Sequence, residues 1–185
     1  FGLLGAVFAC QYPKEKNLTL LPLCVAKDNI LMDKQIDFLK RYTSQPTPLF
    51  LGDHIENNYV NKSVIVGSAP DVSLQLAKMM FEHADAALIL PYNLNSEYQL
   101  SLIASPIASY LNMPLFLMDN NTLDINNVLV SLNVSTLYIV GDYSHPWVVE
   151  KQVILQTVEE IHSMLLDVIK ERFNHLSYIT LTNPS

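Results

Sequence analysis

Apolar and polar residues follow two patterns that alternate along the chain. Short, continuous apolar runs, of which AALIL (Ala86–Leu90) is the clearest, are typical of parallel strands that are covered on both faces. The longer segments between these runs carry apolar residues at helical spacing. The alternation predicts an α/β fold in which crossover helices join the strands of mostly parallel sheets, giving three layers.

Capping-box patterns indicate where two of the helices begin. Ser96 is followed three residues later by Gln99, and Thr157 by Glu160. The first of these helices contains Pro106, which should kink it or start a new turn. Further helices are expected over residues 3–10, 71–83 and 123–132, and further strands over 48–54, 114–118, 136–141 and 176–182.

The two halves of the chain resemble each other. LPLCVAKDN (Leu21–Asn29) is echoed by MPLFLMDN (Met113–Asn120), and PLFLGDH (Pro48–His54) by LYIVGDY (Leu137–Tyr143), at offsets of 89 to 99 residues. Such an internal repeat indicates a tandem supersecondary unit, although generic α/β segments can also resemble each other by chance. We expect two related units, residues 1–92, incomplete at its start, and 93–185, incomplete at its end.

Composition narrows the class of protein. Half of the 185 residues are hydrophobic and 16% are charged, so a folded core is expected rather than disorder. The net charge of −7 argues against nucleic acid as a partner, because that binding needs Lys and Arg to neutralise phosphates. The opening FGLLGAVFAC is too short to span a bilayer and predicts a buried helix, with a lipoprotein cleavage site as a weaker alternative.

Cysteines and glycosylation sequons indicate whether the protein is exported from the cell. Cys10 and Cys24 do not have metal-ligand spacing, and we favour two small buried side chains over a disulfide. Four sequons favour export, and the polar loops around Asn61 and Asn120 should be more accessible than the helix end at Asn133. The four candidate glycosylation sites are Asn17, Asn61, Asn120 and Asn133.

Residues 71–142 are similar to one family in the order of their motifs. A helix ending in an Ala-Asp step is followed by a small-residue helix, by NMPL (Asn112–Leu115), by another helix and by YIVGD (Tyr138–Asp142). This order resembles the clostridial-type cell-wall-binding repeat 2. The resemblance implies a three-layer α/β unit that occurs in tandem in secreted surface proteins of bacteria and archaea and attaches them to the cell envelope without catalysis, often through an anionic wall polymer.

The chain departs from that family at two points. Asp53 and Asp142 stand where the family has the second glycine of its terminal motif, and the family's Arg-x-x-G-x-x-R-y segment is absent. An acidic chain without this basic segment is a poor match for an anionic polymer.

Ligands of parallel α/β sheets bind at the carboxyl ends of the strands, so candidate ligand-binding residues are sought there. Asp142 and His145 could form an acid/base pair or contribute to a metal site, but nothing completes either arrangement. A polar turn explains Asp53 and Asp142 equally well, and in GSAPD (Gly67–Asp71) a helix start capped by Ser68 or Asp71 is favoured over an anion site. The candidates are Asp53, His54, Ser68, Asn93, Asp119, Asn120, Asp142 and His145.

Two functions follow from these patterns. The first is a non-catalytic extracellular module of a larger surface protein, which attaches to a cell-envelope polymer or a neighbouring surface protein, needs no cofactor or metal, and could self-associate. The second is an α/β enzyme or small-ligand receptor domain with its site at the strand ends. The repeat, and the lack of a convergent catalytic set in the sequence, favour the first.

Overall fold

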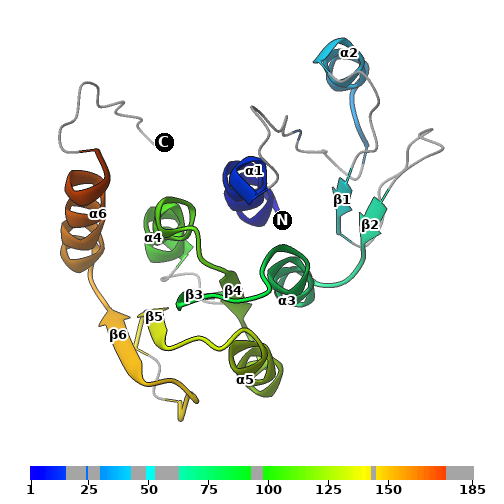
Figure 1. Ribbon diagram of the computed structural model, residues 1–185. Helices are drawn as coiled ribbons and strands as arrows, with labels where there is room; N and C mark the ends of the chain where they lie inside the picture. Colours follow the sequence, from blue (N-terminus) through cyan, green and yellow to red (C-terminus); the bar gives the residue numbers. More distant parts are fainter. Residues whose placement is uncertain are drawn as a thin grey trace.

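The computed structural model describes residues 1–15, 24, 30–42, 49–52, 63–92, 98–142 and 145–173 (Figure 1). These residues form six helices and six strands. The helices are α1 (Gly2–Glu15), α2 (Asp33–Tyr42), α3 (Ala69–Met80), α4 (Tyr98–Leu111), α5 (Thr122–Ser131) and α6 (Val158–Phe173). The strands are β1 (Leu49–Leu51), β2 (Ser63–Ile65), β3 (Ala86–Pro91), β4 (Leu115–Met118), β5 (Thr136–Val140) and β6 (Lys151–Leu155).

The larger sheet has four parallel strands in the order β4-β3-β5-β6. Its central strand β3 contains the continuous apolar run of the sequence, and residues 87–91 are buried as the sequence predicts. Ile89 faces Phe116 of β4 on one side and Ile139 of β5 on the other. The predicted parallel α/β class is therefore confirmed.

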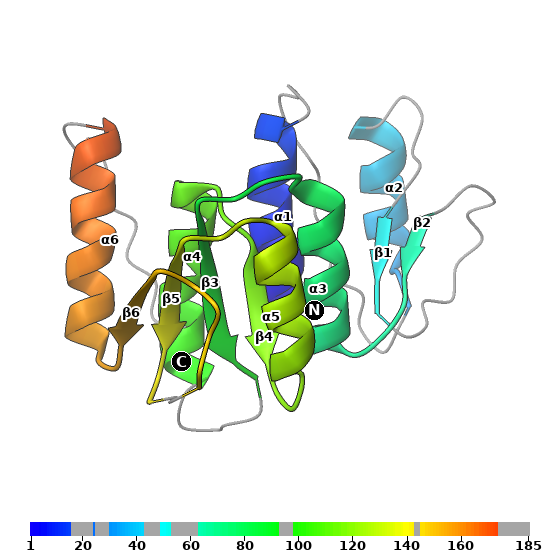
Figure 2. The ribbon, with the colours of Figure 1, turned by 60° about the horizontal axis from the view of Figure 1, so that its bottom comes forward.

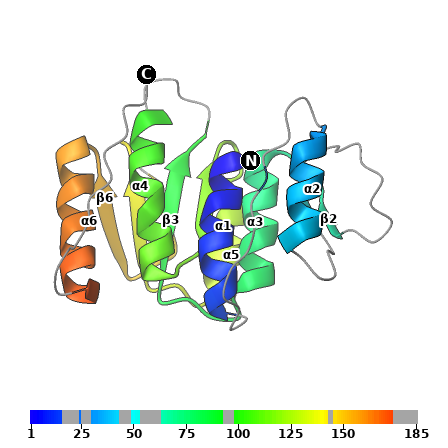
Figure 3. The same ribbon diagram turned by 90° about the horizontal axis from the view of Figure 1, so that it is seen from above.

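Helices cover both faces of this sheet. Leu88 and Leu90 of β3 join the core formed with α4, α6 and α1, whereas Ala87 and Ile89 join the core formed with α5. This alternation is expected, because successive side chains of a strand point to opposite faces. Figure 2 shows α5 on the opposite side of the sheet from α4, and Figure 3 shows α6, α4 and α1 in a row along the other side.

Helix α3 closes the β4 edge of the larger sheet. The buried Ser73 hydroxyl donates to the Pro70 carbonyl (2.6 Å) and accepts from the backbone N–H of Leu117 (3.0 Å). Leu74, Ala77 and Phe81 belong to the same core as α5. A strand edge whose N–H is bonded in this way is not free to accept another strand at that position.

The smaller sheet consists of β1 and β2, which are also parallel. Leu49, Leu51 and Ile65 pack into the core shared with α1 and α3. Phe50 points to the other face and is buried, while its cross-strand neighbour Val64 is exposed. Within the described residues, β1 pairs with β2 alone.

Strand β3 lies in the sheet of the second half of the chain, although the sequence places residues 86–91 in the unit 1–92. It pairs with β4 and β5, both of which come later in the sequence. The two predicted units are therefore joined through a shared strand, and the division at residue 92 stays a prediction.

Strands β2 and β6 were not expected from the sequence. Both lie beside a single described strand and bury few of their residues, so their sequences SVI and KQVIL lack a long apolar run. Short strands at a sheet edge give a weak pattern because one face and one edge stay in water. The strand expected at 176–182 and the helix cap expected at Ser96 lie outside the described residues.

Helix α4 continues through Pro106, where a kink or a new turn was expected. Pro106 has no N–H to donate to the carbonyl of Leu102, four residues earlier. The Ser105 hydroxyl donates to that carbonyl instead, at 3.0 Å. The lost backbone bond is thereby replaced within one continuous helix.

The apolar opening of the chain forms α1, as predicted. Leu4, Val7 and Phe8 are buried, and the buried Gln11 amide donates to the carbonyls of Ala108 (2.9 Å) and Met113 (2.8 Å). In the part of the chain that the structure describes, no helix is long and apolar enough to cross a membrane.

Candidate functional site

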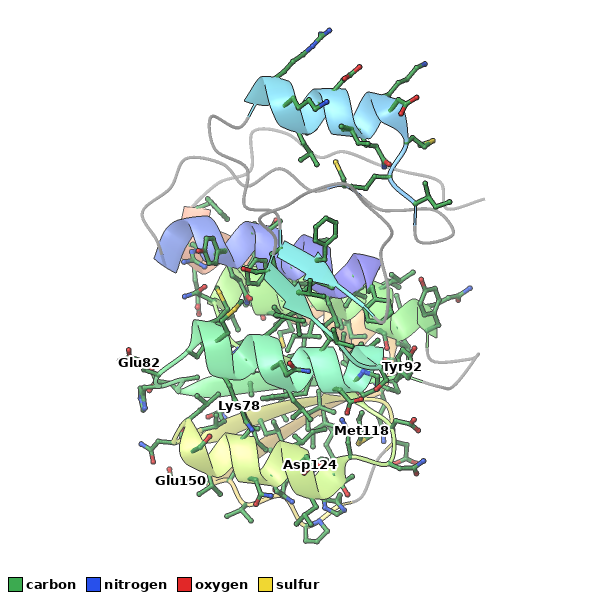
Figure 4. The ribbon with its side chains drawn as sticks, turned by 90° about the vertical axis from the view of Figure 1, so that its right-hand side faces the viewer. Lys78, Glu82, Tyr92, Met118, Asp124 and Glu150 are labelled. Carbon is green, nitrogen blue, oxygen red and sulfur yellow. The ribbon has the colours of Figure 1, made fainter. Side chains whose placement is uncertain are left out.

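The carboxyl ends of β3, β4, β5 and β6 lie along one edge of the larger sheet, because the four strands are parallel. In Figure 4, Tyr92 and Met118 mark this edge, and Glu82 and Glu150 mark the opposite one. We call the edge marked by Tyr92 and Met118 the carboxyl edge. It is where ligands of such sheets bind and where most of the sequence candidates were expected.

Polar groups after β3 and β4 bond to nearby backbone groups. The Tyr92 N–H donates to the Met118 carbonyl (3.0 Å), and the buried Ser101 hydroxyl donates to the Pro91 carbonyl (3.1 Å). Asn121 accepts from the Asp119 N–H (2.9 Å) and donates to the Leu117 carbonyl (3.2 Å). Asn121 thus sets this turn, while the predicted residues Asp119 and Asn120 are exposed.

Asp142 belongs to a short hydrogen-bonded chain after β5 and β6. Its Oδ1 accepts from Gln156 Nε2 (3.2 Å), and the Gln156 N–H donates to Glu160 Oε2 (2.7 Å). Thr157 and Glu160 form the predicted capping box, with bonds of 3.1 and 3.2 Å. Backbone hydrogen bonds from Gln156 and Thr157 lower the pKa of Glu160, because they favour its charged form.

His145 does not join Asp142. Its Nε2 lies 3.4 Å from Asn126 Nδ2 of α5, and its ring lies 4.6 Å from that of Trp147. Asn126 Oδ1 also accepts from the Val148 N–H (3.1 Å). Among the described residues, no hydrogen bond links the two members of the predicted acid/base pair.

Trp147 anchors the loop before β6. Its side chain is buried in the core shared with α5. The only sequence signal was an apolar side chain next to a proline, which does not show whether the side chain packs or is exposed.

Ser68 is part of a helix cap, as the sequence favoured. Its hydroxyl accepts from the Asp71 N–H (3.4 Å), and Asp71 Oδ2 accepts from the Ser68 N–H (3.2 Å) and hydroxyl (2.6 Å). The carboxylate of Asp71 therefore occupies the helix start that would have held an anion.

Charge is unevenly distributed along the carboxyl edge. Carboxylates occupy the first turns of α5 (Asp124) and α6 (Glu159, Glu160), while basic residues occupy the last turns of α3 and α6. Helices α5 and α6 start at the carboxyl edge. Their acidic first turns therefore repel anions there and complement the helix dipoles.

Neither cysteine forms a disulfide. Cys10 is exposed, which corrects the expectation of two buried side chains, and Cys24 is partly buried. Burial raises the pKa of the Cys24 thiol. Within the described ranges, no three His, Cys, Asp or Glu side chains form a group that could hold a metal ion.

Two of the four sequons can be placed. Asn120 is exposed in the turn between β4 and α5, and Asn133 is exposed just after α5 with a positive φ of 56°. The exposure of Asn133 is greater than its position at a helix end suggested. Asp53, His54, Asn93, Asn17 and Asn61 lie outside the described residues.

Comparisons of the chain with protein-family models, with curated proteins and with solved structures found no match. The resemblance to the cell-wall-binding repeat thus stays an expectation from the sequence motifs.

Proposed function

We propose that the chain contains two copies of one α/β unit and serves as a non-catalytic, extracellular module of a larger surface protein. The observation that carries this proposal is a matched pair of turns. After β1, the Gly52 N–H donates to the Ile65 carbonyl at the end of β2 (3.1 Å); after β5, the Gly141 N–H donates to the Leu155 carbonyl at the end of β6 (2.9 Å). Both glycines have positive φ, +133° and +93°.

The helices that follow support the same duplication. Ser68–Asp71 and Thr157–Glu160 are capping boxes separated by 89 residues, the same spacing that separates Gly52 from Gly141. The residues after the two boxes, Val72 and Ile161, are both fully buried. The turn glycines and the capping boxes thus share an offset of 89 residues, while the acceptors Ile65 and Leu155 are 90 residues apart.

The order of elements also repeats. The series α1, α2, β1, β2, α3 is followed by α4, α5, β5, β6, α6, and in the second series β4 lies between the first two helices. The face of β1–β2 that packs on α1 and α3 corresponds to the face of β5–β6 that packs on α4 and α6. Strand β3 precedes α4 and pairs with β4 and β5, although the division at residue 92 places it in the first unit.

A duplicated unit fits a module that supplies surface and length. Repeats of this kind gain stability by packing on one another and present extended surfaces for binding. The placed polar candidates support this use, since Ser68 bonds within its helix cap and Asp142 bonds to Gln156 of the neighbouring turn. The acidic carboxyl edge favours a neutral polymer or a neighbouring surface protein over an anionic polymer.

Binding to the envelope tests the proposal directly. The purified chain should sediment with cell envelopes prepared from its own source organism, and removing envelope polymer or envelope protein should show which of the two retains it. A chain that stays in the supernatant with intact envelopes at both low and high salt would reject the attachment role.

Mass spectrometry of the native protein tests the compartment. We expect a glycan on Asn120 or Asn133, because both side chains are exposed, and we expect the protein in the surface fraction. Bare sequons together with a purely cytosolic fraction would rule out export.

Alanine substitution tests the non-catalytic part. The full-length parent protein, screened against hydrolase and transferase substrates, should show no turnover that Asp142→Ala or His145→Ala abolishes. Turnover that disappears in either variant while the fold survives would identify an enzyme.

A further inference from the structure

The outer face of α5 is largely apolar, although a helix usually carries charged residues opposite its buried face. Leu123 is 73% exposed and Val130 is 59% exposed. They lie about two turns apart on one stripe of the helix, with the exposed Asn127 between them. Asp124 is the one charged residue among the ten of α5, whereas α2, which has the same length, contains five. We call Leu123, Asn127 and Val130 the α5 outer face.

The loop before β6 widens this apolar surface. The Val148 N–H donates to Asn126 Oδ1 (3.1 Å), so the loop lies against α5. Val148 itself is 62% exposed, next to the buried Trp147. Neighbouring apolar side chains that stay exposed usually mark a surface that something covers.

A glycosylation sequon stands at each end of the α5 outer face. Asn120 lies three residues before Leu123, in the turn that starts α5, and Asn133 lies three residues after Val130, in the turn that ends it. Both asparagines are exposed. At about 1.5 Å per residue, Leu123 and Val130 are about 10 Å apart along the helix. A glycan attached at either end therefore reaches the nearer apolar side chain with its first sugars.

We propose that Asn120 and Asn133 both carry glycans, and that the first sugars of each glycan pack over the nearer apolar side chain of the α5 outer face. The inference rests on the proposed export. The C–H faces of a sugar ring are apolar and its hydroxyls remain in water, so this layer covers Leu123 and Val130 without leaving polar groups unpaired. An envelope partner must then bind to another face of the molecule.

The modification is a glycosyl transfer to the asparagine side-chain amide. The Nδ2 nitrogen forms a bond to the anomeric carbon of an oligosaccharide that is carried on a lipid diphosphate. The bond between that carbon and the diphosphate oxygen breaks, and the lipid diphosphate leaves. One amide proton passes to a base of the transferring enzyme.

Hydroxyl-radical footprinting of the chain, secreted from a host that glycosylates sequons, tests the proposal. The comparison is the double variant of Asn120→Asp and Asn133→Asp from the same host, which keeps the other two sequons. Aspartate is chosen because it accepts no glycan and tolerates the positive φ of residue 133. Oxidation of Leu123 and Val130, measured by mass spectrometry, should be several-fold higher in the double variant.

Leu166 of α6 is the matched control, because it is also an exposed leucine, at 47%, and is distant in sequence from both asparagines. Its oxidation should be the same in the two chains. The single variants separate the two ends: Asn120→Asp should chiefly expose Leu123, and Asn133→Asp should chiefly expose Val130. Circular dichroism verifies folding; if Asn133→Asp does not fold, the contrast between Asn120→Asp and the original chain decides.

Bare Asn120 or Asn133 in the secreted chain would overturn the proposal, as would equal oxidation of Leu123 and Val130 in the original chain and the double variant. No envelope is present in these assays, so both results leave the attachment role standing. A chain whose glycans protect the two side chains but which does not bind envelopes would reject the attachment role alone.

Discussion

The β1–β2 pair and the β5–β6 pair share their turns but differ in what surrounds them. Both pairs are parallel, and both end in a left-handed glycine that bonds across to the next strand. β5 also has β3 on its other side, whereas β1 has only β2 among the described residues. Helix α5 buries its inner residues completely, and α2 does not. The local sequence thus sets the conformation of the turn. The burial of each strand pair and its helix depends on how many other elements pack against them.

The largest expected effect is at the centre of the four-stranded sheet. Ile139 is fully buried and lies opposite Ile154 of β6, which is 48% exposed. Ile139→Ala should destabilise the fold by about 2–5 kcal/mol, because it removes buried methyl groups and leaves a cavity.

Ile154→Ala is the matched control, since it makes the same change one strand away. Because surface substitutions usually have small effects, we expect a loss below about 1 kcal/mol. Urea denaturation of both variants gives the two values, and equal losses would contradict the assigned difference between the central and edge strands.

The two turn glycines test whether the shared geometry matters equally in both pairs. Gly52→Ala and Gly141→Ala should each cost about 1–3 kcal/mol, because a side chain at positive φ is strained. A Cβ at Gly52 would lie 3.5 Å from the Phe1 ring, an ordinary contact, so the backbone alone accounts for the cost there.

Gly2→Ala is the control for this pair. Gly2 begins α1 with open space around it, so Ala should be neutral or stabilising by up to about 1 kcal/mol. Chemical denaturation measures all three variants. A negligible loss for Gly52→Ala beside a full loss for Gly141→Ala would show that the β1–β2 turn does not constrain the fold.

The hydrogen bond between the Ser73 hydroxyl and the Leu117 N–H, which joins α3 to β4, should contribute a similar amount. Ser73→Ala leaves the Leu117 N–H without its partner, and a buried unpaired donor costs about 1–3 kcal/mol. Ser101→Ala removes a buried hydroxyl that donates to the Pro91 carbonyl, so the net value of an ordinary hydrogen bond, about 0.5–1.5 kcal/mol, is expected. Hydrogen exchange at Leu117 should accelerate in Ser73→Ala alone; unchanged exchange would mean that the hydroxyl does not protect this edge.

The smallest effect concerns the α6 cap and pH. The pKa of Glu160 is lowered in the folded chain, so its contribution is fully present above the ordinary Glu pKa and is lost as pH falls through the lowered value. Glu160→Gln should therefore be less stable than the original chain at neutral pH, and the gap should close in acid. Thermal denaturation across this pH range measures the gap, and a gap that widens in acid would contradict the assigned cap.

The sequence predicted what depends on local or strongly periodic residues. The buried strand at Ala86–Leu90 and the cap at Thr157 were identified because each pattern is determined within a few residues. The edge strand β6 was missed because its residues are mostly exposed, and Gln156 was missed as the partner of Asp142 because that bond joins two turns that come together only in the sheet. Likewise, the separation of His145 from Asp142 follows from the contact of His145 with Asn126 on α5, which is a tertiary effect.

The order in which the chain is synthesised decides when the bond between Ser73 and Leu117 can form. A protein is synthesised from its N-terminus, so α3 leaves the ribosome before β4, and the hydroxyl that seals the β4 edge is present when that strand emerges. During refolding from denaturant both segments are released at once, and the β4 edge can meet another molecule first. Folding during synthesis should therefore give less aggregate than refolding at the same protein concentration.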